Sequence, residues 1–448
     1  MSTQSNTLWQ RAGKVLGGGP ATLSKHPGRF CQGLAPVFID YGSGAYVLDV
    51  DGRRYIDTIA ALGPILLGHS HHAVTEAVIE QAYHLTSASL PTRLEVEVAE
   101  RLVEMVPGAE QVRFASNGKD VTEAAVKVAR YVTGKQHVIY VGYHGGFGDY
   151  LATTDKDGGV LPCLKTYNHQ VPWGDEDAIL DCLDSCYLDL AAIIYEVPPA
   201  PWGESLDTTQ HIMARYAELA HGAQALMIVD EVVTGFRYGL GGAQALYDVR
   251  ADLACFSKGM ANGYKLAALT GARDLMQAFD GGKVFLSTTF GGEATTLAAC
   301  KATLDVLQQT PALEHLQCHG VVVGNTLDRL LEKYAIPARL RGNYARMVLD
   351  WYAAPEIATA EELRTLWLQE LLKRGVLASV PIFSMCCWNE QIVEELCGAF
   401  EAACAVLAQV VHEQRPIGDV LECPTITDVF QQRYRSPETP EEHQHANG

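Results

Sequence analysis

Short apolar runs alternate with amphipathic stretches through the middle of the chain. The stretches VTEAAVKVARYVTG and TTQHIMARYAELAHG have the pattern of amphipathic helices. The apolar runs between such stretches read as buried strands, and we expect five of them, at 137–143, 190–198, 224–232, 253–259 and 266–272. This alternation is typical of a mostly parallel sheet that is covered by helices.

The two ends of the chain follow different patterns. Residues 36–58, PVFIDYGSGAYVLDVDGRRYIDT, predict a small antiparallel meander with turns at Gly42–Gly44 and Asp51–Gly52. Past residue 310, a predicted helix, EELRTLWLQELLKRG, mixes with short strands such as RMVLDWY. The N-terminal meander and the C-terminal part are therefore expected to form one smaller α+β domain.

These patterns predict the following division of the chain. Residues 61–310 form a large domain, and residues 1–60 join 311–415 in the smaller domain. Residues 416–448 form an extension whose polar tail, from Ser436, is expected to be disordered.

The overall composition narrows the class of protein. With 448 residues, 48% of them hydrophobic and 19% charged, the chain is long enough for more than one domain of a globular enzyme. The formal net charge of −19 and the lack of a Lys/Arg cluster argue against a nucleic-acid partner. Twelve scattered cysteines without a secretory signal indicate free thiols in a reducing cytoplasm. No apolar run reaches the ~20 residues that span a bilayer, so we expect no membrane span.

Charged residues follow directly on two of the predicted strands. In LMIVDEVV, four apolar residues lead into Asp230 and Glu231, and carboxylates at the end of a buried strand need a positive partner. In LACFSKGMANG, Lys258 stands at the mouth of a buried segment, where a lowered pKa favours the free amine and hence a Schiff base. A lysine whose stem covers apolar surface while its amine stays in water would give the same pattern, and Lys265 is a rival candidate.

A possible phosphate site precedes the first of the two predicted helices. The turn Asn117-Gly118-Lys119-Asp120 leads into that helix, and a helix N-terminus suits a phosphate; an ordinary N-cap by Asn117 or Asp120 would explain the same residues. A phosphate cradle, an acid and a lysine are together the parts that hold pyridoxal 5'-phosphate (PLP), whose pyridine nitrogen needs a carboxylate to stay protonated. PLP is therefore the predicted cofactor, and its pyridinium is the predicted cation facing Asp230.

Metal binding is not expected from the spacing of His and Cys residues. We read His69, His71 and His72 as turn and packing residues, because no carboxylate stands at ligand spacing from them. The pairs Cys182/Cys186 and Cys386/Cys387 lack the spacing of a zinc site.

Three motifs carry a resemblance to a known family. DEVVTGFRYGLGGAQ, DLACFSKGMANG and STTFGGE resemble the class III, fold type I, PLP-dependent aminotransferases, in the branch related to glutamate-1-semialdehyde 2,1-aminomutase. The resemblance covers roughly residues 15 to 410. It implies an α/β fold type I PLP transferase, with a mostly parallel seven-stranded sheet flanked by helices in the large domain and a smaller α+β domain.

The resemblance also implies roles for individual residues. Lys258 would form the internal aldimine and carry the proton, and Asp230 would pair with the pyridine nitrogen. The remaining cofactor contacts implied by the family are Val232 on one ring face, Tyr143 on the other with His144 beside it, Glu196 near the cofactor, and Asn117, Gly118, Lys119 and Asp120 along the phosphate loop. Thr289 would reach the phosphate of the neighbouring subunit, which implies a homodimer. Tyr143 as a core aromatic and Thr289 as a turn residue remain alternatives.

Several positions depart from the family pattern. Lys119 replaces a small Ser or Thr in the phosphate loop, and Val197 replaces a proline after Glu196. Residues 20–25, PATLSK, replace a Ser-Pro-Val-Arg-like run, so the substrate contacts of the aminomutase are not preserved. This segment looks more like relatives that act on sugars or other specialised amines. Cys386, Cys387 and Trp388 replace small polar or His residues and would make one wall of a pocket more apolar.

The predicted function is amino-group transfer. A small-molecule amine donates the group to PLP at Lys258, and a keto or aldehyde acceptor takes it in a second half-reaction, which gives ping-pong kinetics. The first alternative is an intramolecular aminomutase, which needs no separate acceptor, and the second is other PLP chemistry such as decarboxylation or epimerisation. A non-catalytic scaffold disagrees with the intact Asp230 and Lys258, and a nicotinamide dehydrogenase lacks its G-x-G-x-x-G motif.

Overall fold

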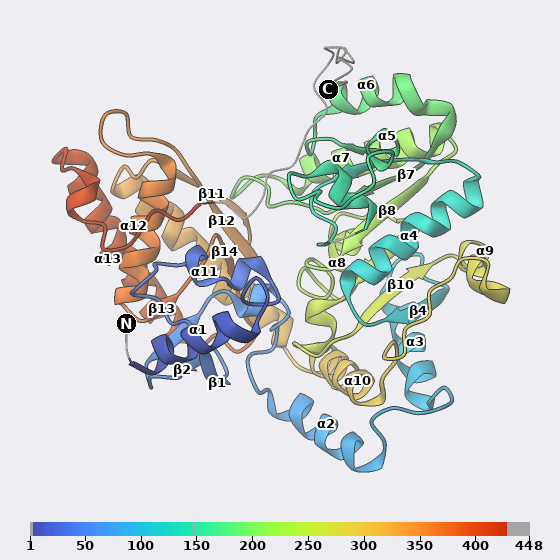
Figure 1. Cartoon of the computed structure of the whole chain (residues 1–448), viewed down its shortest axis with the longest axis horizontal. Coiled ribbons are helices and arrows are strands. Elements are labelled where there is room, and N and C mark those ends of the chain that lie inside the picture. The colour runs from blue at the N-terminus through green and yellow to red at the C-terminus, as the bar shows by residue number, and fades with distance from the viewer. Residues whose placement is uncertain (1–2, 147, 428–448) are drawn as a thin grey trace.

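The computed structural model describes residues 3–146 and 148–427, and the elements form two groups (Figure 1). One group holds the middle of the chain, and the other combines its N-terminal and C-terminal parts (Figure 1). The predicted disordered tail from Ser436 lies outside the described residues.

A seven-stranded sheet forms the centre of the first group, in the order β4-β10-β9-β8-β7-β5-β6. Only β10 runs against its neighbours β4 and β9; the other adjacent pairs are parallel. The five strands predicted from apolar runs and the mostly parallel sheet are confirmed. The bounds are β4 Gln111–Ala115, β5 His137–Val141, β6 Asn168–Gln170, β7 Leu190–Tyr195, β8 Leu226–Glu231, β9 Leu253–Phe256 and β10 Ala267–Gly271.

Helices cover both faces of this sheet because each strand alternates its side chains between two cores. Val138 and Tyr140 join the core that contains the apolar face of α4, whereas Ile139 and Val141 join the core under α6 and α7. The helices of this group are α2 His72–His84, α3 Arg93–Met105, α4 Gly118–Thr133, α5 Leu164–Tyr167, α6 Glu176–Cys186, α7 Leu206–Gly222, α8 Gly242–Leu246, α9 Arg273–Met276 and α10 Ala294–Gln309.

The second group contains two small sheets and four helices, and the last three helices contribute to its own core. The predicted meander is present as β1 Ile39–Ser43, β2 Tyr46–Asp49 and β3 Arg54–Asp57, and β13 Val376–Leu377 pairs with β3 in parallel. The second sheet is β11 Ala338–Asn343, β12 Arg346–Trp351 and β14 Pro381–Phe383. The helices are α1 Thr3–Val15, α11 Ala312–Lys333, α12 Ala360–Lys373 and α13 Glu390–His412.

The predicted domain boundaries at residues 60, 310 and 415 stay predictions. The separate cores of the two groups support them. Short 3₁₀ helices complete the fold: η1 Leu23–Lys25, η2 Pro27–Arg29, η3 Ala60–Leu62, η4 Asp149–Thr153, η5 Tyr187–Asp189, η6 Lys258–Ala261, η7 Gln277–Gly282 and η8 Ile417–Asp419. Among the described helices, none is both long enough and apolar enough to cross a membrane.

The buried side chain of Arg237 ties the two groups together. Its guanidinium donates to the carbonyl oxygens of Ser384 at 2.6 Å, Gly63 at 2.8 Å and Ile65 at 3.0 Å, and lies 5.0 Å from the centre of the Phe383 ring. Burial lowers the pKa of Arg237 to about 10, which leaves it charged at neutral pH. The cation therefore holds segments from both groups through backbone oxygens instead of a carboxylate.

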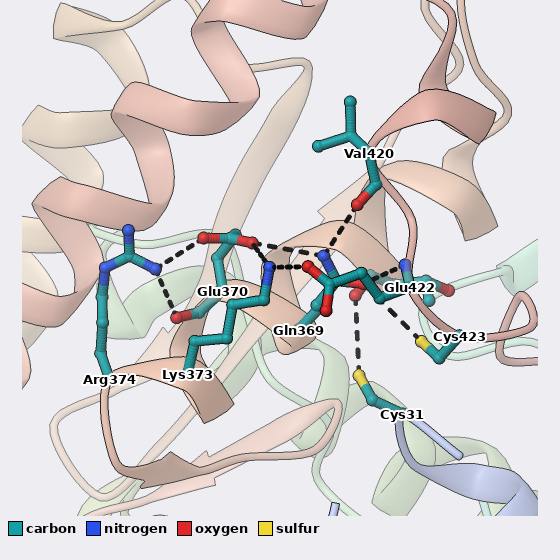
Figure 2. Close-up of polar contacts among 9 residues, drawn as sticks. Cys31, Gln369, Glu370, Lys373, Arg374, Val420, Glu422 and Cys423 are labelled. Atoms are coloured by element: carbon teal, nitrogen blue, oxygen red, sulfur yellow. Dashed lines mark hydrogen bonds and ion pairs between the residues drawn. The ribbon is translucent and has the colours of Figure 1, made fainter. Parts of the chain in front are cut away.

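The segment after α13 folds back onto α12 and is held there by polar side chains (Figure 2). The buried amide of Gln369 donates to the carbonyl of Val420 at 3.0 Å and accepts from the backbone N–H of Glu422 at 2.7 Å. Lys373 binds both Glu370 and Glu422, which places an ion pair beside this amide (Figure 2). The described part of the predicted extension is thus an ordered strap across α12.

Two glycines of α11 allow other elements to approach this helix closely. A Cβ atom on Gly320 would lie 2.0 Å from the carbonyl oxygen of Tyr344, and one on Gly324 would lie 2.0 Å from Cη2 of Trp202. Glycine inside a helix costs about 1 kcal/mol relative to alanine. The close approach of the β11–β12 turn and of Trp202 explains why α11 nevertheless carries glycine.

Gly320→Ala is expected to lower the free energy of unfolding by about 1–3 kcal/mol, because overpacking outweighs the gain in helix propensity. The matched control is Gly398→Ala in α13, where nothing lies within 4 Å of the added Cβ. This control should raise the free energy of unfolding by about 0.5–1 kcal/mol. Chemical denaturation of both variants measures the difference, and a gain at both positions would contradict the close packing of α11.

Candidate active site

The predicted acid and lysine follow neighbouring strands of the large sheet. Asp230 lies near the carboxyl end of β8, where it pairs with Cys255 of β9, and Lys258 follows two residues after the end of β9. The carboxyl ends of parallel strands in an open α/β sheet are where ligands bind. The topology therefore brings these two residues to the same edge of the sheet.

The buried carboxylate of Asp230 is held by two donors. Its Oδ1 accepts from the backbone N–H of Val232 at 3.0 Å, and its Oδ2 lies 2.8 Å from Nδ1 of His144. Nε2 of His144 lies 3.1 Å from the carbonyl oxygen of Val141, so both ring nitrogens face acceptors. His144 therefore holds the Asp230 carboxylate in place, whereas the family resemblance placed it only beside the cofactor.

Glu231, the second carboxylate after the strand, has a different environment. It is fully buried and accepts hydrogen bonds from the hydroxyl of Thr234 and, at 2.9 Å each, from the backbone N–H groups of Ala243 and Gln244. Burial raises the pKa of this carboxyl group. Glu231 therefore holds the start of α8 against β8 and does not face the site.

The Lys258 side chain makes no hydrogen bond or ion pair within the described residues. Burial lowers the pKa of its ammonium group, opposed by the nearby carboxylates of Glu196 and Asp230, while the guanidinium of Arg346 also lowers it. Lys258 itself has a positive φ of 45° at the start of η6. An amine with a lowered pKa and no partner is available as a nucleophile and as a proton carrier.

A buried ion pair stands near Lys258. Glu196 follows β7, and its carboxylate lies 2.6 Å from Nη1 of Arg346, with the two side chains 12% and 17% exposed. Arg346 comes from β12 in the second group of elements, and its Nε is buried without a hydrogen-bond partner. No sequence signal identified Arg346, because an arginine that begins a surface-like strand has no recognisable motif.

Tyr143 presents a ring beside Asp230. It is 44% exposed, and the Tyr150 ring packs edge-on against it with centroids 5.7 Å apart. Burial of the hydroxyl, with the charges of Asp230 and Glu196, raises the pKa of Tyr143. The half-exposed ring therefore lies within electrostatic range of both carboxylates of the site.

The predicted phosphate loop combines a helix cap with the N-terminus of a helix. Asn117 caps α4, and Asp120 accepts from the backbone N–H of Asn117 at 3.0 Å, so the alternative reading of these two residues as an N-cap is correct. The N-terminus of α4, at Gly118, carries the positive end of the helix dipole and suits an anion. The Lys119 ammonium lies 2.9 Å from Glu123 one turn along α4, so this position already has a carboxylate partner.

Gly118 shows how closely this loop meets the end of β8. A Cβ on Gly118 would lie 2.8 Å from the side chain of Val232. Val232 in turn donates its N–H to Asp230. Gly118 at the N-terminus of α4 therefore contacts Val232, and Val232 in turn contacts Asp230.

The other candidate residues lie elsewhere. Thr289 is exposed between η7 and α10, and no contact joins it to the rest of the site within the described chain. Lys265 is exposed, with its amine 5.0 Å from the centre of the Phe290 ring, so it is not the buried lysine. Cys386 and Trp388 are buried, and the N–H of Cys386 donates to Leu66 at 2.8 Å, so they pack against the segment before α2.

These residues fit PLP. The carboxylate of Asp230 is fixed by Val232 and His144, the amine of Lys258 has no partner, and the N-terminus of the 16-residue helix α4 meets Val232 through Gly118. A carboxylate, an amine and a helix N-terminus are the donor and acceptor types needed for a pyridine nitrogen, an aldehyde and a phosphate.

Comparison with known proteins gives consistent findings. The class III aminotransferase profile matches residues 31–403. The chain is 31% identical to the 3-aminobutyryl-CoA aminotransferase of Cloacimonas acidaminovorans, over 91% of this chain and 97% of that protein. It is 33% identical to the glutamate-1-semialdehyde 2,1-aminomutase of Chloroflexus aurantiacus, over 77% and 80%. A solved transaminase with PLP bound superposes with a TM-score of 0.81 at 26% identity, covering 93% of this chain and 99% of that one.

Lys258→Met is expected to stabilise the cofactor-free protein by roughly 1–2 kcal/mol at neutral pH, because an apolar side chain replaces a buried amine without a partner. The folded-state pKa of Lys258 lies below its ordinary value of 10.5, so the unfolded chain binds more protons between the two values. The wild type therefore gains stability as the pH rises, and the gap to the variant closes toward pH 10.5.

Thermal or chemical unfolding of both proteins across this pH range measures the gap, with Lys265→Met as the exposed control that should change little. Lysine and methionine both carry a Cβ atom, so the positive φ at position 258 costs the wild type and the Lys258→Met variant about the same and does not contribute to the difference. A variant no more stable than the wild type at neutral pH would contradict the burial of an unpaired amine.

Proposed function

Because the chain belongs to the class III aminotransferases, we propose that Lys258 is the residue at which this PLP-dependent transaminase moves an amino group. The substrates are an amine donor and a keto or aldehyde acceptor. The observation that carries the proposal is the Lys258 amine, which has a lowered pKa, no hydrogen-bond partner and the fixed carboxylate of Asp230 as its neighbour.

PLP, when bound, supplies an aldehyde that bonds to amines and a ring that takes up electrons when a proton leaves the carbon bearing the amine. In the proposal Asp230 holds a proton at a ring nitrogen, and its hydrogen bond to His144 orients the carboxylate for this. Lys258 Nζ accepts the substrate proton as a neutral amine and returns it at another carbon. Its lowered pKa increases the fraction of this amine that is unprotonated.

The remaining residues orient the reacting groups. In the proposal Tyr143 and Val232 flank the cofactor ring, and the N-terminus of α4 at Gly118 binds the phosphate. Asn117 and Asp120 act indirectly, because they cap α4 and aim its N-terminus. The Glu196–Arg346 ion pair has no net charge. Its carboxylate raises the pKa of the Lys258 amine and its guanidinium lowers it, so the two effects oppose each other.

The working unit in our proposal is a homodimer in which Thr289 binds the phosphate held by the neighbouring subunit. The support is the position of Thr289 on an exposed segment that also carries Phe285 and Phe290, 74% and 51% exposed. Thr289→Val should weaken PLP binding about tenfold while leaving the dimer intact, since one charge-assisted hydrogen bond is lost. Unchanged PLP affinity would remove Thr289 from the site.

A cytoplasmic location is also part of the proposal. No disulfide joins the twelve cysteines, all of which lie in the described residues, and a reducing compartment keeps thiols in that state. The identity of the acceptor, including the sugar or specialised amine suggested by residues 20–25, stays a prediction. The substrates named for the two relatives differ from each other, so neither is assigned to this chain.

The direct test uses the visible absorbance of the purified, PLP-loaded protein. Borohydride should remove the band of the wild type and leave PLP covalently on the peptide that contains Lys258, as found by mass spectrometry. Lys258→Ala should lack this product, whereas the matched control Lys265→Ala should retain it. Labelling at Lys265 or nowhere would overturn the assignment.

A panel of amines then separates the two candidate functions. Amines that bleach the band are donors, and in a transaminase the band returns only when a keto or aldehyde compound is added. An aminomutase of the type named for the Chloroflexus aurantiacus relative would turn over a single substrate without an acceptor. Full turnover with one substrate alone would favour this second function.

A further inference from the structure

A cluster of potential metal ligands lies in the large sheet, outside the site described above. His137 begins β5, His169 lies in the edge strand β6, and Cys186 ends α6. One ligand atom from each residue lies within 4.8 Å of the other two. In residues 3–146 and 148–427, no other group of three His, Cys, Asp or Glu side chains meets in this way.

The alternation of β5 explains why these side chains meet. His137 and Ile139 lie on the same face of β5, and Ile139 pairs with His169 of β6. Ile139 belongs to the core that also contains Cys182 and Cys186 of α6, so that face is covered by this helix. The three potential ligands thus come from three elements that pack together, which sequence spacing does not reveal.

The two imidazole rings already bring one nitrogen each to the same place. The rings of His137 and His169 are stacked, with centroids 5.1 Å apart and an angle of 4° between planes. Nδ1 of His137 lies 2.8 Å from Nε2 of His169. Two nitrogens bound tetrahedrally at about 2.0–2.1 Å from zinc lie about 3.3 Å apart, so the two nitrogens need to separate by about half an ångström and the rings need to turn toward the ion.

Asp189 provides the outer contact that metal-bound histidines commonly have. Its Oδ2 lies 3.7 Å from Nε2 of His137, and its Oδ1 accepts from the backbone N–H of Gln136 at 3.2 Å. A carboxylate on the far nitrogen orients a ligating imidazole and strengthens it as a donor.

We propose that His137, His169 and Cys186 bind a Zn²⁺ ion whose fourth position faces solvent. Two imidazole nitrogens and a thiolate are a donor set that suits Zn²⁺. Binding releases the thiol proton of Cys186, which otherwise donates to the carbonyl of Cys182 at 3.1 Å. The proton between the two histidines moves to the outer nitrogen of its ring, which for His137 faces Asp189.

Such an ion would fasten the edge of the sheet. The short strand β6 has β5 as its only neighbour in the sheet, and Cys186 is the last residue of α6. One metal would join β5, β6 and α6 at a point where the sheet ends. Its expected effect is on the stability of this edge, so the proposal does not depend on which substrate is transaminated.

The test uses the full-length, PLP-loaded protein, freed of metal by a chelator and kept with a phosphine reductant. Co²⁺ serves as the optical probe, because thiolate ligation adds a charge-transfer band to its absorption, and Zn²⁺ then displaces it. We expect one tight site per chain and a higher unfolding temperature with Zn²⁺. Asp189→Asn should lower the affinity about 10-fold to 100-fold without changing the stoichiometry.

Matched variants locate the ion. Cys186→Ala should abolish the charge-transfer band and the Zn²⁺-dependent rise in unfolding temperature, and His169→Gln should abolish tight binding. Cys318→Ala is the control, because this exposed thiol stands between His315 and His319 on α11 and is the natural place for adventitious binding. A band lost in Cys318→Ala but kept in Cys186→Ala would overturn the proposal. If the wild type takes up neither Co²⁺ nor Zn²⁺, the proposal is also overturned. This result does not depend on whether the variants fold.

Discussion

The large group of elements is organised around one buried carboxylate. Asp230 is 3% exposed and ends a run of four apolar residues, where an isolated charge would cost several kcal/mol. His144 and the amide of Val232 offset this cost, and each brings a loop with it. Tyr143 precedes His144 along the chain, and Val232 donates to Asp230 directly. The same two contacts that offset the cost of burying the carboxylate therefore also fix the positions of Tyr143 and Val232, the two residues proposed to flank the cofactor ring.

The position of Lys258 depends on the order and direction of the strands more than on any single side-chain contact. Because β8 and β9 are parallel neighbours, the residues after each strand meet at the same edge, and Lys258 reaches Asp230 without a side-chain bond of its own. The second group of elements contributes Arg346, which forms an ion pair with Glu196. The Glu196 carboxylate raises the pKa of Lys258, and the Arg346 guanidinium opposes this effect. Burial is the largest of these effects, so the pKa of the Lys258 amine lies below its ordinary value.

The fold and the principal acid and lysine were predictable because their signals are local. Apolar runs followed by Asp230 or Lys258 are visible in the sequence alone. The reversed direction of β10 was not visible, since a strand buried on both faces reads the same in either direction. Lys119 could not be seen to pair with Glu123 until the helix start was known. Arg346 was missed because its partner, Glu196, is 150 residues away.

Strand β5 connects the two sites that we propose. His137 stands at its amino end, and at its carboxyl end the carbonyl of Val141 accepts from His144, the partner of Asp230. A displacement of β5 along the sheet would therefore move His144 relative to a carboxylate that belongs to β8. β7 holds β5 on one side, whereas only the three-residue strand β6 holds it on the other. A metal that joins β6 to β5 would strengthen the weaker of these two attachments, and so would also support the position of His144.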